Sequence, residues 1–394
     1  TYRDFLMVED TVAGRIASTT CIVPWRFRYD EVELCAAQVE VVATHPDYRR
    51  RGLLRAQMHR IHRVLLERGV HLSAIGGIPN YYRQFGYTYA IDQLRPVLVP
   101  AHAIPRAPSG DGERIRLREA AVDDARMLAQ LYARAMAPVA LHDQRSEEFW
   151  RYLLRWCRLP LQIVEDSDTG AAVGYVSAGP PGRAGVAHVG ESAIFSTDIA
   201  FAVLRRLSSP STTAVAVGGP KTGLLRQVAT TLAPAPARHP QWLLRIGDLA
   251  GFLRQIGPVP ERRLARSAFA GLSCDVRLNT FREAVDLRFQ AGKLVGVDRA
   301  GFVDASLRAD GGPLQFPADA LVRLALGYRS VDQLLDAWPD IVIAPELRML
   351  PEVLFPAMSS FLYLPYNYAG PVPDTAAGAL SVPSSGSGER RAHD

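Results

Sequence analysis

The chain has 394 residues, of which 48% are hydrophobic and 22% charged, the composition of a soluble globular protein. No apolar run approaches the roughly 20 residues that a membrane-spanning helix needs, and we expect no membrane association. The formal charge of +5 is spread along the chain, and no basic tract with interleaved aromatic residues suggests a nucleic-acid partner. The length predicts two to three domains.

The four cysteines lie far apart, without a Cys-x-x-Cys pair and without neighbouring paired histidines. This spacing argues against a structural zinc site and against a fold built on disulfides. We therefore expect no metal, and a reducing, cytoplasmic location.

Residues 1–100 predict a first unit with many strands. A helix is predicted over Leu53–Gly69. A loop is predicted further along the chain, where the sequence has Gly76, Gly77, Pro79 and Asn80. The expected strands are Asp4–Asp10, Val12–Thr20, Cys21–Phe27, Glu31–Thr44, Val70–Ile75 and Tyr87–Ile91.

The stretch Val99–Gly112, rich in Pro, Gly and small residues, predicts an exposed linker. A second unit is expected over residues 113–245, opening with a strand and an amphipathic helix that has Asp123 or Asp124 in its first turn, where negative charge is favourable. Its later elements are helices at Glu147–Cys157, Ile199–Leu207 and Leu224–Thr230 and strands at Leu161–Glu165, Ala172–Ser177, Val186–Phe195 and Thr213–Val217.

A third unit is expected over residues 246–370, and its composition predicts that the tail 371–394 is disordered. Leu243–Ile246 and then Asp248–Gln255 are expected to begin this unit. Its predicted helices are Pro317–Leu326 and Val331–Trp338, and its predicted strands are Gly271–Leu278, Glu283–Gln290 and Lys293–Asp298.

The stretch Val39–Leu54 combines a short apolar strand, a turn with Pro46, three consecutive arginines and Gly52, just before the predicted helix. Free N–H groups at a helix N-terminus favour anions, and arginine suits phosphate. The stretch therefore predicts a phosphate site. The alternative is an ordinary strand-to-helix connection with solvated arginines.

The sequence VVATHPDYRRRGLL resembles motif A of the GNAT superfamily of acyl-CoA-dependent N-acyltransferases, whose turn is Arg/Gln-x-x-Gly-x-Gly/Ala. Here Leu54 replaces the last small residue. The later sequence YYRQFGY resembles motif B, Tyr-x-x-x-Gly-Phe, with Tyr82 and Gly86 in register and Tyr87 in place of phenylalanine. The ordered pair of motifs is a much more specific signal than either one alone.

The sequences RRRGLLRA and YRQFGY also resemble those of the Eis-like (enhanced intracellular survival) acetyltransferases. The resemblance to this family extends over nearly the whole chain. The resemblance implies a mixed α+β and α/β fold: tandem GNAT-like domains and a C-terminal sterol-carrier-like domain. The second unit lacks the Arg-x-x-Gly-x-Gly turn, so we expect it to be degenerate. A complete GNAT domain has a strand and two helices before the point where this chain begins, and we expect these to be missing or disordered. Homo-oligomers, hexamers in that family, are also implied.

The resemblance implies that acetyl-CoA is the co-substrate, and it indicates which residues would bind this co-substrate. Backbone groups of the strand would bond the pantetheine arm, N–H groups at the helix start would wrap the pyrophosphate, and the residues after the next strand would lie near the acyl group. An ordinary turn role remains open for Asn80, and solvation for the arginines. The expected binding residues are Val42, Ala43, Thr44, Arg49, Arg50, Arg51, Gly52, Leu53, Leu54, Arg55, Gly77, Ile78 and Asn80.

The chemistry needs a base for the attacking ammonium and an acid for the departing thiolate. Tyr82 matches the acid of the superfamily, and Tyr81 competes if the loop is slipped by one. Glu40 is a tentative base, with a solvated strand position as its alternative role. The C-terminal carboxylate serves Eis-like enzymes, but Asp394 ends a long polar tail. His59 and His62 are expected on the surface of the motif helix rather than as ligands.

We therefore expect an N-acetyltransferase that transfers the acetyl group of acetyl-CoA to a small-molecule primary amine, aminoglycoside-like or a lysine side chain, by direct attack on the thioester. The competing hypothesis is a binding protein that captures CoA thioesters or apolar ligands without catalysis.

Overall fold

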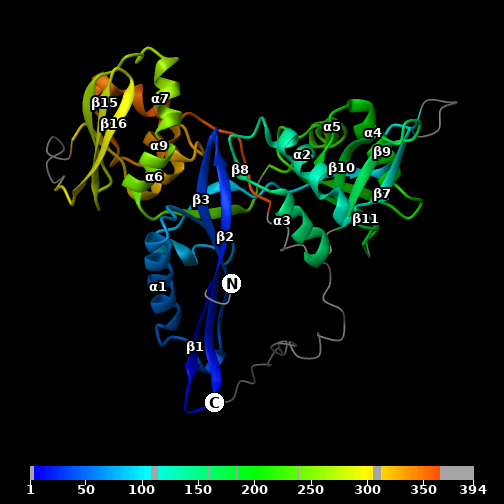
Figure 1. The fold of residues 1–394 in the computed structure, drawn as a ribbon, viewed down its shortest axis with the longest axis horizontal. Helices are drawn as coiled ribbons and strands as arrows, with labels where there is room; N and C mark the ends of the chain where they lie inside the picture. Colours follow the sequence, from blue (N-terminus) through cyan, green and yellow to red (C-terminus); the bar gives the residue numbers. More distant parts are fainter. Residues whose placement is uncertain are drawn as a thin grey trace, which may run out of the picture.

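In the computed structural model the chain forms three β-sheets, each with its own helices (Figure 1). The structure describes residues 4–107, 114–157, 160–182, 184–237, 239–304 and 312–363. The predicted tail 371–394, with Asp394, lies outside the described residues. Among the described helices, none combines the length and the apolarity that crossing a bilayer requires.

Two long strands, β2 (Arg15–Tyr29) and β3 (Val32–Thr44), form an antiparallel hairpin at the centre of the first sheet, drawn in blue in Figure 1. The predicted break at Thr20 is wrong: β2 is one continuous strand, because its residues on both sides of Thr20 pair with β3 across a single bulge. The other strands of this sheet are β1 (Phe5–Asp10), β4 (Leu72–Ile75), β5 (Thr88–Asp92), β8 (Leu141–Asp143), β13 (Gln241–Ile246) and β19 (Ser360–Phe361).

Helix α1 (Leu53–Glu67) packs on one face of this sheet, as its apolar spacing predicts. Met58, Ile61 and Leu65 are buried against side chains of β2 and β3, while the arginines of the helix face solvent. Two short 3₁₀ helices flank this part of the sheet, η2 (Pro46–Tyr48) before α1 and η3 (Tyr81–Phe85) after β4.

The second sheet has the order β6-β12-β11-β10-β9-β7 and lies on the right in Figure 1. Helix α2 (Ala125–Met136) begins directly after Asp124, whose carboxylate accepts a hydrogen bond from the Ala121 N–H, which confirms the acidic helix start. The remaining elements are β6 (Val97–Pro100), β7 (Ile115–Glu119), β9 (Leu161–Asp166), β10 (Ala172–Ala178), β11 (Val186–Ala193), β12 (Ala214–Val217), α3 (Glu147–Tyr152), α4 (Thr197–Leu207) and α5 (Leu224–Leu232).

The predicted linker Val99–Gly112 is wrong at its start. Val97 and Val99 are fully buried in β6, which pairs antiparallel with β12, and Ile104 is buried as well. Apolar alternation prevails here over the proline-rich composition, because the valines fill the core of the second sheet. Residues 108–113 of the linker lie outside the described residues.

The first and second sheets both include strands from the sequence range of the other unit. β6 is the last strand of residues 1–100 but joins the second sheet, whereas β13 begins at the end of the second unit and pairs antiparallel with both β4 and β5 of the first sheet. β8 pairs with β2. The sheets therefore do not follow the sequence-based boundaries at residues 100 and 245, because the chain crosses between them at both points.

A buried ionic cluster joins these parts of the chain. The fully buried Arg145 guanidinium donates to Asp143 of β8 at 2.7 Å, to Glu191 of β11 at 2.6 Å and to the carbonyl oxygen of Tyr363 at 3.1 Å. The same guanidinium lies 4.3 Å from the centroid of the Tyr132 ring. The cluster thus connects the first sheet, the second sheet and the C-terminal end of the described chain.

The third sheet, at the upper left of Figure 1, has the order β16-β15-β14-β17-β18. The two helices and three strands predicted for the third unit are present there, with ends shifted by a few residues, whereas the expected first segment, Leu243–Ile246, lies in β13 of the first sheet. Its elements are β14 (Cys274–Asn279), β15 (Ala284–Gln290), β16 (Lys293–Gly301), β17 (Leu314–Gln315), β18 (Val342–Ile343), α6 (Leu249–Ile256), α7 (Pro258–Ala265), α8 (Ala318–Ala325), α9 (Val331–Ala337) and α10 (Leu350–Leu354).

Candidate active site

The parallel strands β3 and β4 part in the middle of the first sheet. Their pairing runs from Ala36–Leu72 to Gln38–Ala74, after which β4 ends while β3 continues to Thr44. The other edge of this extension still pairs with β2. Since no described strand pairs with the free edge of residues 42–44, their backbone groups there are available to a ligand.

A bulge at Val41 marks the point where β3 leaves β4. Val41 has a φ of 53°, a left-handed conformation that is unusual for a β-branched residue. The Thr19 hydroxyl donates to the Val41 carbonyl at 3.0 Å, and the Ser18 hydroxyl donates to the Ala43 carbonyl at 2.9 Å. These bonds from β2 hold the bulge in place and so fix the direction of the free segment.

The N-terminus of α1 lies at the end of the loop that follows this segment. Gly52 has a φ of 75° at the N-cap position, and no side chain caps the helix. The first backbone bond in the helix runs from the Ala56 N–H to the Gly52 carbonyl at 3.1 Å. The N–H groups of the first turn are therefore without intrahelical partners, which is the geometry of an anion site.

The arginines of the loop divide into two kinds. Arg51 donates to the Asp47 carbonyl at 3.0 Å, and Arg55 donates to Gln84 at 2.9 Å, so both side chains are held by the protein. Arg49 and Arg50 are exposed and have no ion-pair partner among the described residues. Only these last two are free to meet a phosphate.

Tyr82 of η3 is buried, with 4% of its surface exposed, and its ring lies against Gly77. Burial raises the pKa of the Tyr82 hydroxyl, with smaller contributions from Tyr81 and Glu40. Its hydroxyl has no hydrogen-bond partner among the described residues. A raised pKa keeps the phenol protonated near neutral pH, as a general acid requires.

The other predicted residues of this loop differ in their contacts and in their exposure. Asn80 has a left-handed φ of 65°, its N–H donates to the Tyr89 hydroxyl at 2.7 Å, and its side-chain oxygen accepts from Arg83 at 3.4 Å. These contacts hold Asn80 in the turn that precedes η3. Ile78 is 62% exposed, and Tyr81 is 38% exposed with its ring edge-on to Tyr82.

Glu40 lies on β3 just before the bulge, directly opposite Cys21 of β2. Burial raises the pKa of its carboxyl group, and the charge of Glu40 contributes to the raised pKa of Tyr82. The Glu40 carboxylate accepts a hydrogen bond from the side-chain amide of Gln38. The sequence analysis missed Gln38, although strand alternation places positions 38 and 40 on the same face.

The nearby histidines lie outside this site. His62 packs 5.8 Å from the ring of Tyr87, and burial lowers its pKa to about 3, so the imidazole is neutral. His59 is exposed on α1. Within the described ranges, no group of three or more His, Cys, Asp or Glu side chains is arranged to hold a metal.

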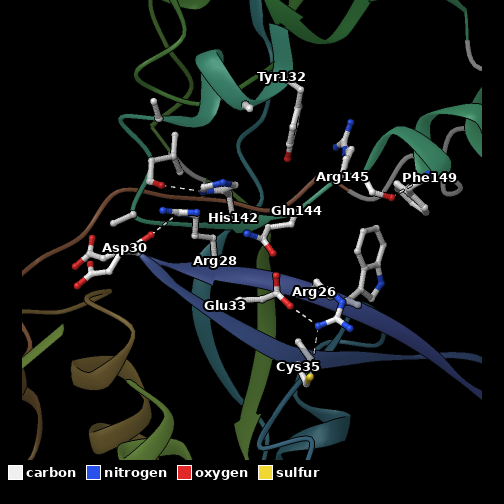
Figure 2. A pocket seen from close by; sticks show the side chains of 18 of the residues that line it. Arg26, Arg28, Asp30, Glu33, Cys35, Tyr132, His142, Gln144, Arg145 and Phe149 are labelled. Carbon is white, nitrogen blue, oxygen red and sulfur yellow. Dashed lines mark hydrogen bonds and ion pairs between the residues drawn. The ribbon is translucent and has the colours of Figure 1, made fainter. Parts of the chain in front are cut away.

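A large hollow, of about 1220 Å³, lies elsewhere, over the start of β3 and beside α2 (Figure 2). Its acidic side chains are largely neutralised: Glu33 pairs with Arg26, and Glu31 pairs with Arg262. From Cys35 in this hollow to Thr44 the strand rises by roughly 30 Å. The hollow is thus separate from the site at the end of β3.

The second sheet repeats the parallel pair of strands, with a shorter connection to the helix that follows. β11 and β12 are parallel with α4 between them, as β3 and β4 are with α1. However, only Ile194, Phe195 and Ser196 join β11 to α4. The Tyr363 hydroxyl packs against Gly190 at the point where β11 passes the end of β12. This three-residue connection replaces the longer loop with arginines and glycine that precedes α1 in the first sheet.

A family model described as acetyltransferase (GNAT) domain matches residues 2–90. The match spans β1 to β4 with α1 and the first residues of β5, and it includes both motifs. Residues 2–90 are therefore similar to a GNAT acetyltransferase domain. No curated protein matches the chain at a significant level.

Solved structures resemble the chain over most of its length. A GCN5-related N-acetyltransferase from Anabaena variabilis has a TM-score of 0.66 at 16% identity, over 92% of this chain and 89% of that one. A probable N-acyltransferase from Enterococcus faecalis has a TM-score of 0.66 at 20% identity, covering 89% and 87%. Eis1 from Mycobacterium abscessus has a TM-score of 0.62 at 17% identity, covering 91% and 89%. At these identities the likeness shows a shared fold.

Proposed function

We propose that the chain is an acetyl-CoA-dependent N-acetyltransferase that acetylates a primary amine, aminoglycoside-like or a lysine side chain. The observation that carries the proposal is the free edge of Val42–Thr44 next to the uncapped N-terminus of α1. A pantetheine arm, with its amide groups, suits the free strand edge. A pyrophosphate suits the N–H groups of residues 52–55, with Arg49 and Arg50 as additional positive charges.

In the proposed reaction the neutral amine attacks the thioester carbonyl directly, forming the C–N bond as the C–S bond breaks. Glu40 takes the proton of the ammonium group, for which burial suits it because the raised pKa makes the carboxylate a stronger base. Tyr82 donates the proton that the departing thiolate needs. Gly77 and Ile78 follow β4 and would flank the acetyl group.

The organisation expected from the sequence is part of the same proposal: an Eis-like arrangement of a GNAT catalytic domain, a degenerate GNAT-like domain and a sterol-carrier-like domain. The fold shared with Eis1 supports it. So does the short connection from β11 to α4, which leaves no loop for a pyrophosphate. The free cysteines are compatible with a cytoplasmic enzyme, and assembly into homo-oligomers belongs to the family resemblance.

Thiol release from acetyl-CoA, measured with a panel of amines, tests the proposed function. The panel contains an aminoglycoside, a linear polyamine, a lysine-containing peptide and an apolar monoamine. Amine-dependent thiol release with a matching acetylated product is expected for at least one of them. Saturable binding of CoA without thiol release from any amine would instead favour a binding protein.

A further inference from the structure

We infer that Gln38 is a positioning residue for the reaction, which holds the carboxylate of Glu40 in the orientation needed to accept the proton of the acceptor amine. This inference rests on the proposed function. Neither sequence motif includes Gln38, which lies on β3 two residues before Glu40 and four before the free edge.

The first argument is burial. Gln38 is fully buried, one of the few polar side chains in the sheet with no exposed surface. A buried amide costs free energy unless it is hydrogen-bonded. Its side-chain nitrogen donates to Glu40, but its side-chain oxygen is buried without a partner. The hydrogen bond to Glu40 is therefore the one described interaction that offsets the cost of this amide.

The second argument is what else holds Glu40. The other bond to its carboxylate comes from the Val41 N–H at 3.4 Å, at the long limit of a hydrogen bond. No salt bridge to Glu40 is found among the described residues. The charge of Glu40 contributes to the raised pKa values of Cys21 on β2 and Tyr82 on η3, and neither of these groups is a cation. Without a cation at salt-bridge distance, the carboxylate depends on the Gln38 amide for its orientation.

The third argument is the position of the pair in the sheet. Gln38 pairs with Ala74 in the last register position before β3 and β4 part. Its backbone is therefore fixed on both sides, by β2 and by β4, whereas Glu40 lies beyond the last pair with β4. Gln38, held on both sides, can therefore support the Glu40 carboxylate where β3 and β4 part. Catalytic groups are commonly held in this way by neighbouring residues with fixed positions.

The test is the pH dependence of kcat/KM for wild type, Gln38→Met and Gln38→Glu, together with the Kd of acetyl-CoA. Methionine keeps the length of the side chain but removes the donor, so the ionised form of Glu40 loses a charge-assisted bond. We expect the acidic limb of the profile to move to higher pH and kcat/KM at pH 6 to fall about tenfold, with an unchanged Kd. Glutamate at position 38 adds a like charge and is expected to move the limb further in the same direction.

Gln57→Met is the matched control, because Gln57 is also a buried amide but lies on α1, where its side-chain nitrogen donates to the Leu6 carbonyl at 3.1 Å. It is expected to lower the Tm without moving the acidic limb. If wild type shows amine-dependent turnover and both Gln38 variants keep the wild-type limb, the inference is wrong while the proposed function stands. If wild type shows no turnover with any amine, the proposed function itself fails.

Discussion

The ring of Tyr82 lies 3.0 Å from the position that a Cβ atom on Gly77 would occupy. Gly77 also has a φ of 149°, which L-residues with side chains rarely adopt. The absence of a side chain at position 77 therefore allows the proposed acid to reach the end of β4, where the acetyl group is expected.

Gly77→Ala should displace the Tyr82 ring and lower kcat by about tenfold, since small misplacements of a catalytic group are costly. The control is Gly14→Ala, at a φ of 61° with nothing within 4 Å of the added methyl group. The control carries the backbone strain without the contact, so its Tm should fall while its kcat stays at the wild-type value. Equal kcat values for both variants would show that the Gly77–Tyr82 contact is irrelevant to turnover.

Tyr82→Phe removes the proposed proton donor while keeping the buried ring. We expect kcat to fall about 100-fold, in the usual range for general acid catalysis, with the Kd of acetyl-CoA unchanged by calorimetry. Tyr81→Phe is the matched control and should keep most of the activity, because its ring is largely outside the site. A Tyr82→Phe variant with wild-type turnover would remove this residue from the mechanism, and loss of turnover in Tyr81→Phe alone would exchange the two roles.

Arg49→Ala and Arg50→Ala should each raise the Kd of acetyl-CoA by about threefold to tenfold, the effect of one partly exposed charge on a phosphate. Added salt should narrow the difference from wild type, since it screens exposed charges. Arg63→Ala is the control, because Arg63 is an exposed arginine on the same helix, roughly 15 Å from its start. Equal Kd values for all three variants would contradict the phosphate role.

Glu40→Gln should lower activity and raise stability. Because burial raises the pKa of Glu40 in the folded state, the folded protein binds this proton more tightly than the unfolded chain. The stability from this group is greatest below its unfolded pKa and is lost as pH rises through the folded pKa. The Tm of Glu40→Gln should therefore exceed that of wild type at pH 8, with the difference vanishing near pH 4. A lower Tm at pH 8 would mean that the carboxylate stabilises the fold.

Arg145→Met should destabilise the protein by about 3–5 kcal/mol, because Asp143 and Glu191 would remain buried without their counter-charge. Urea unfolding measures the change. Arg151→Met is the control: the exposed pair with Glu147 on α3 is worth about 0.5 kcal/mol or less. Similar losses in the two variants would show that the buried cluster does not hold the sheets together.

The sequence predicted the elements around the proposed donor site because their features are local. Gly52, the arginines and the strand before them are contiguous, and periodicity placed α1 correctly. Motif B identified Tyr82, whereas the burial of its ring depends on the fold. These elements need only neighbouring residues to be recognised.

Long-range pairing could not be predicted in the same way. β13 enters the first sheet from more than a hundred residues away, and nothing in its local sequence distinguishes β5 or β4 from another partner. The bulge at Val41 depends on hydroxyl groups of the neighbouring strand β2. Gln38 could have been found from alternation with Glu40, but its burial depends on β4.

The location of bound CoA tests the central claim most directly, and a crystal structure of the full chain with CoA would provide it. We predict the pyrophosphate on the N–H groups of residues 52–55, the pantetheine along the free edge of residues 42–44, and the sulfur within hydrogen-bonding distance of the Tyr82 hydroxyl. CoA in the hollow of Figure 2, or with its sulfur directed away from Tyr82, would contradict the account.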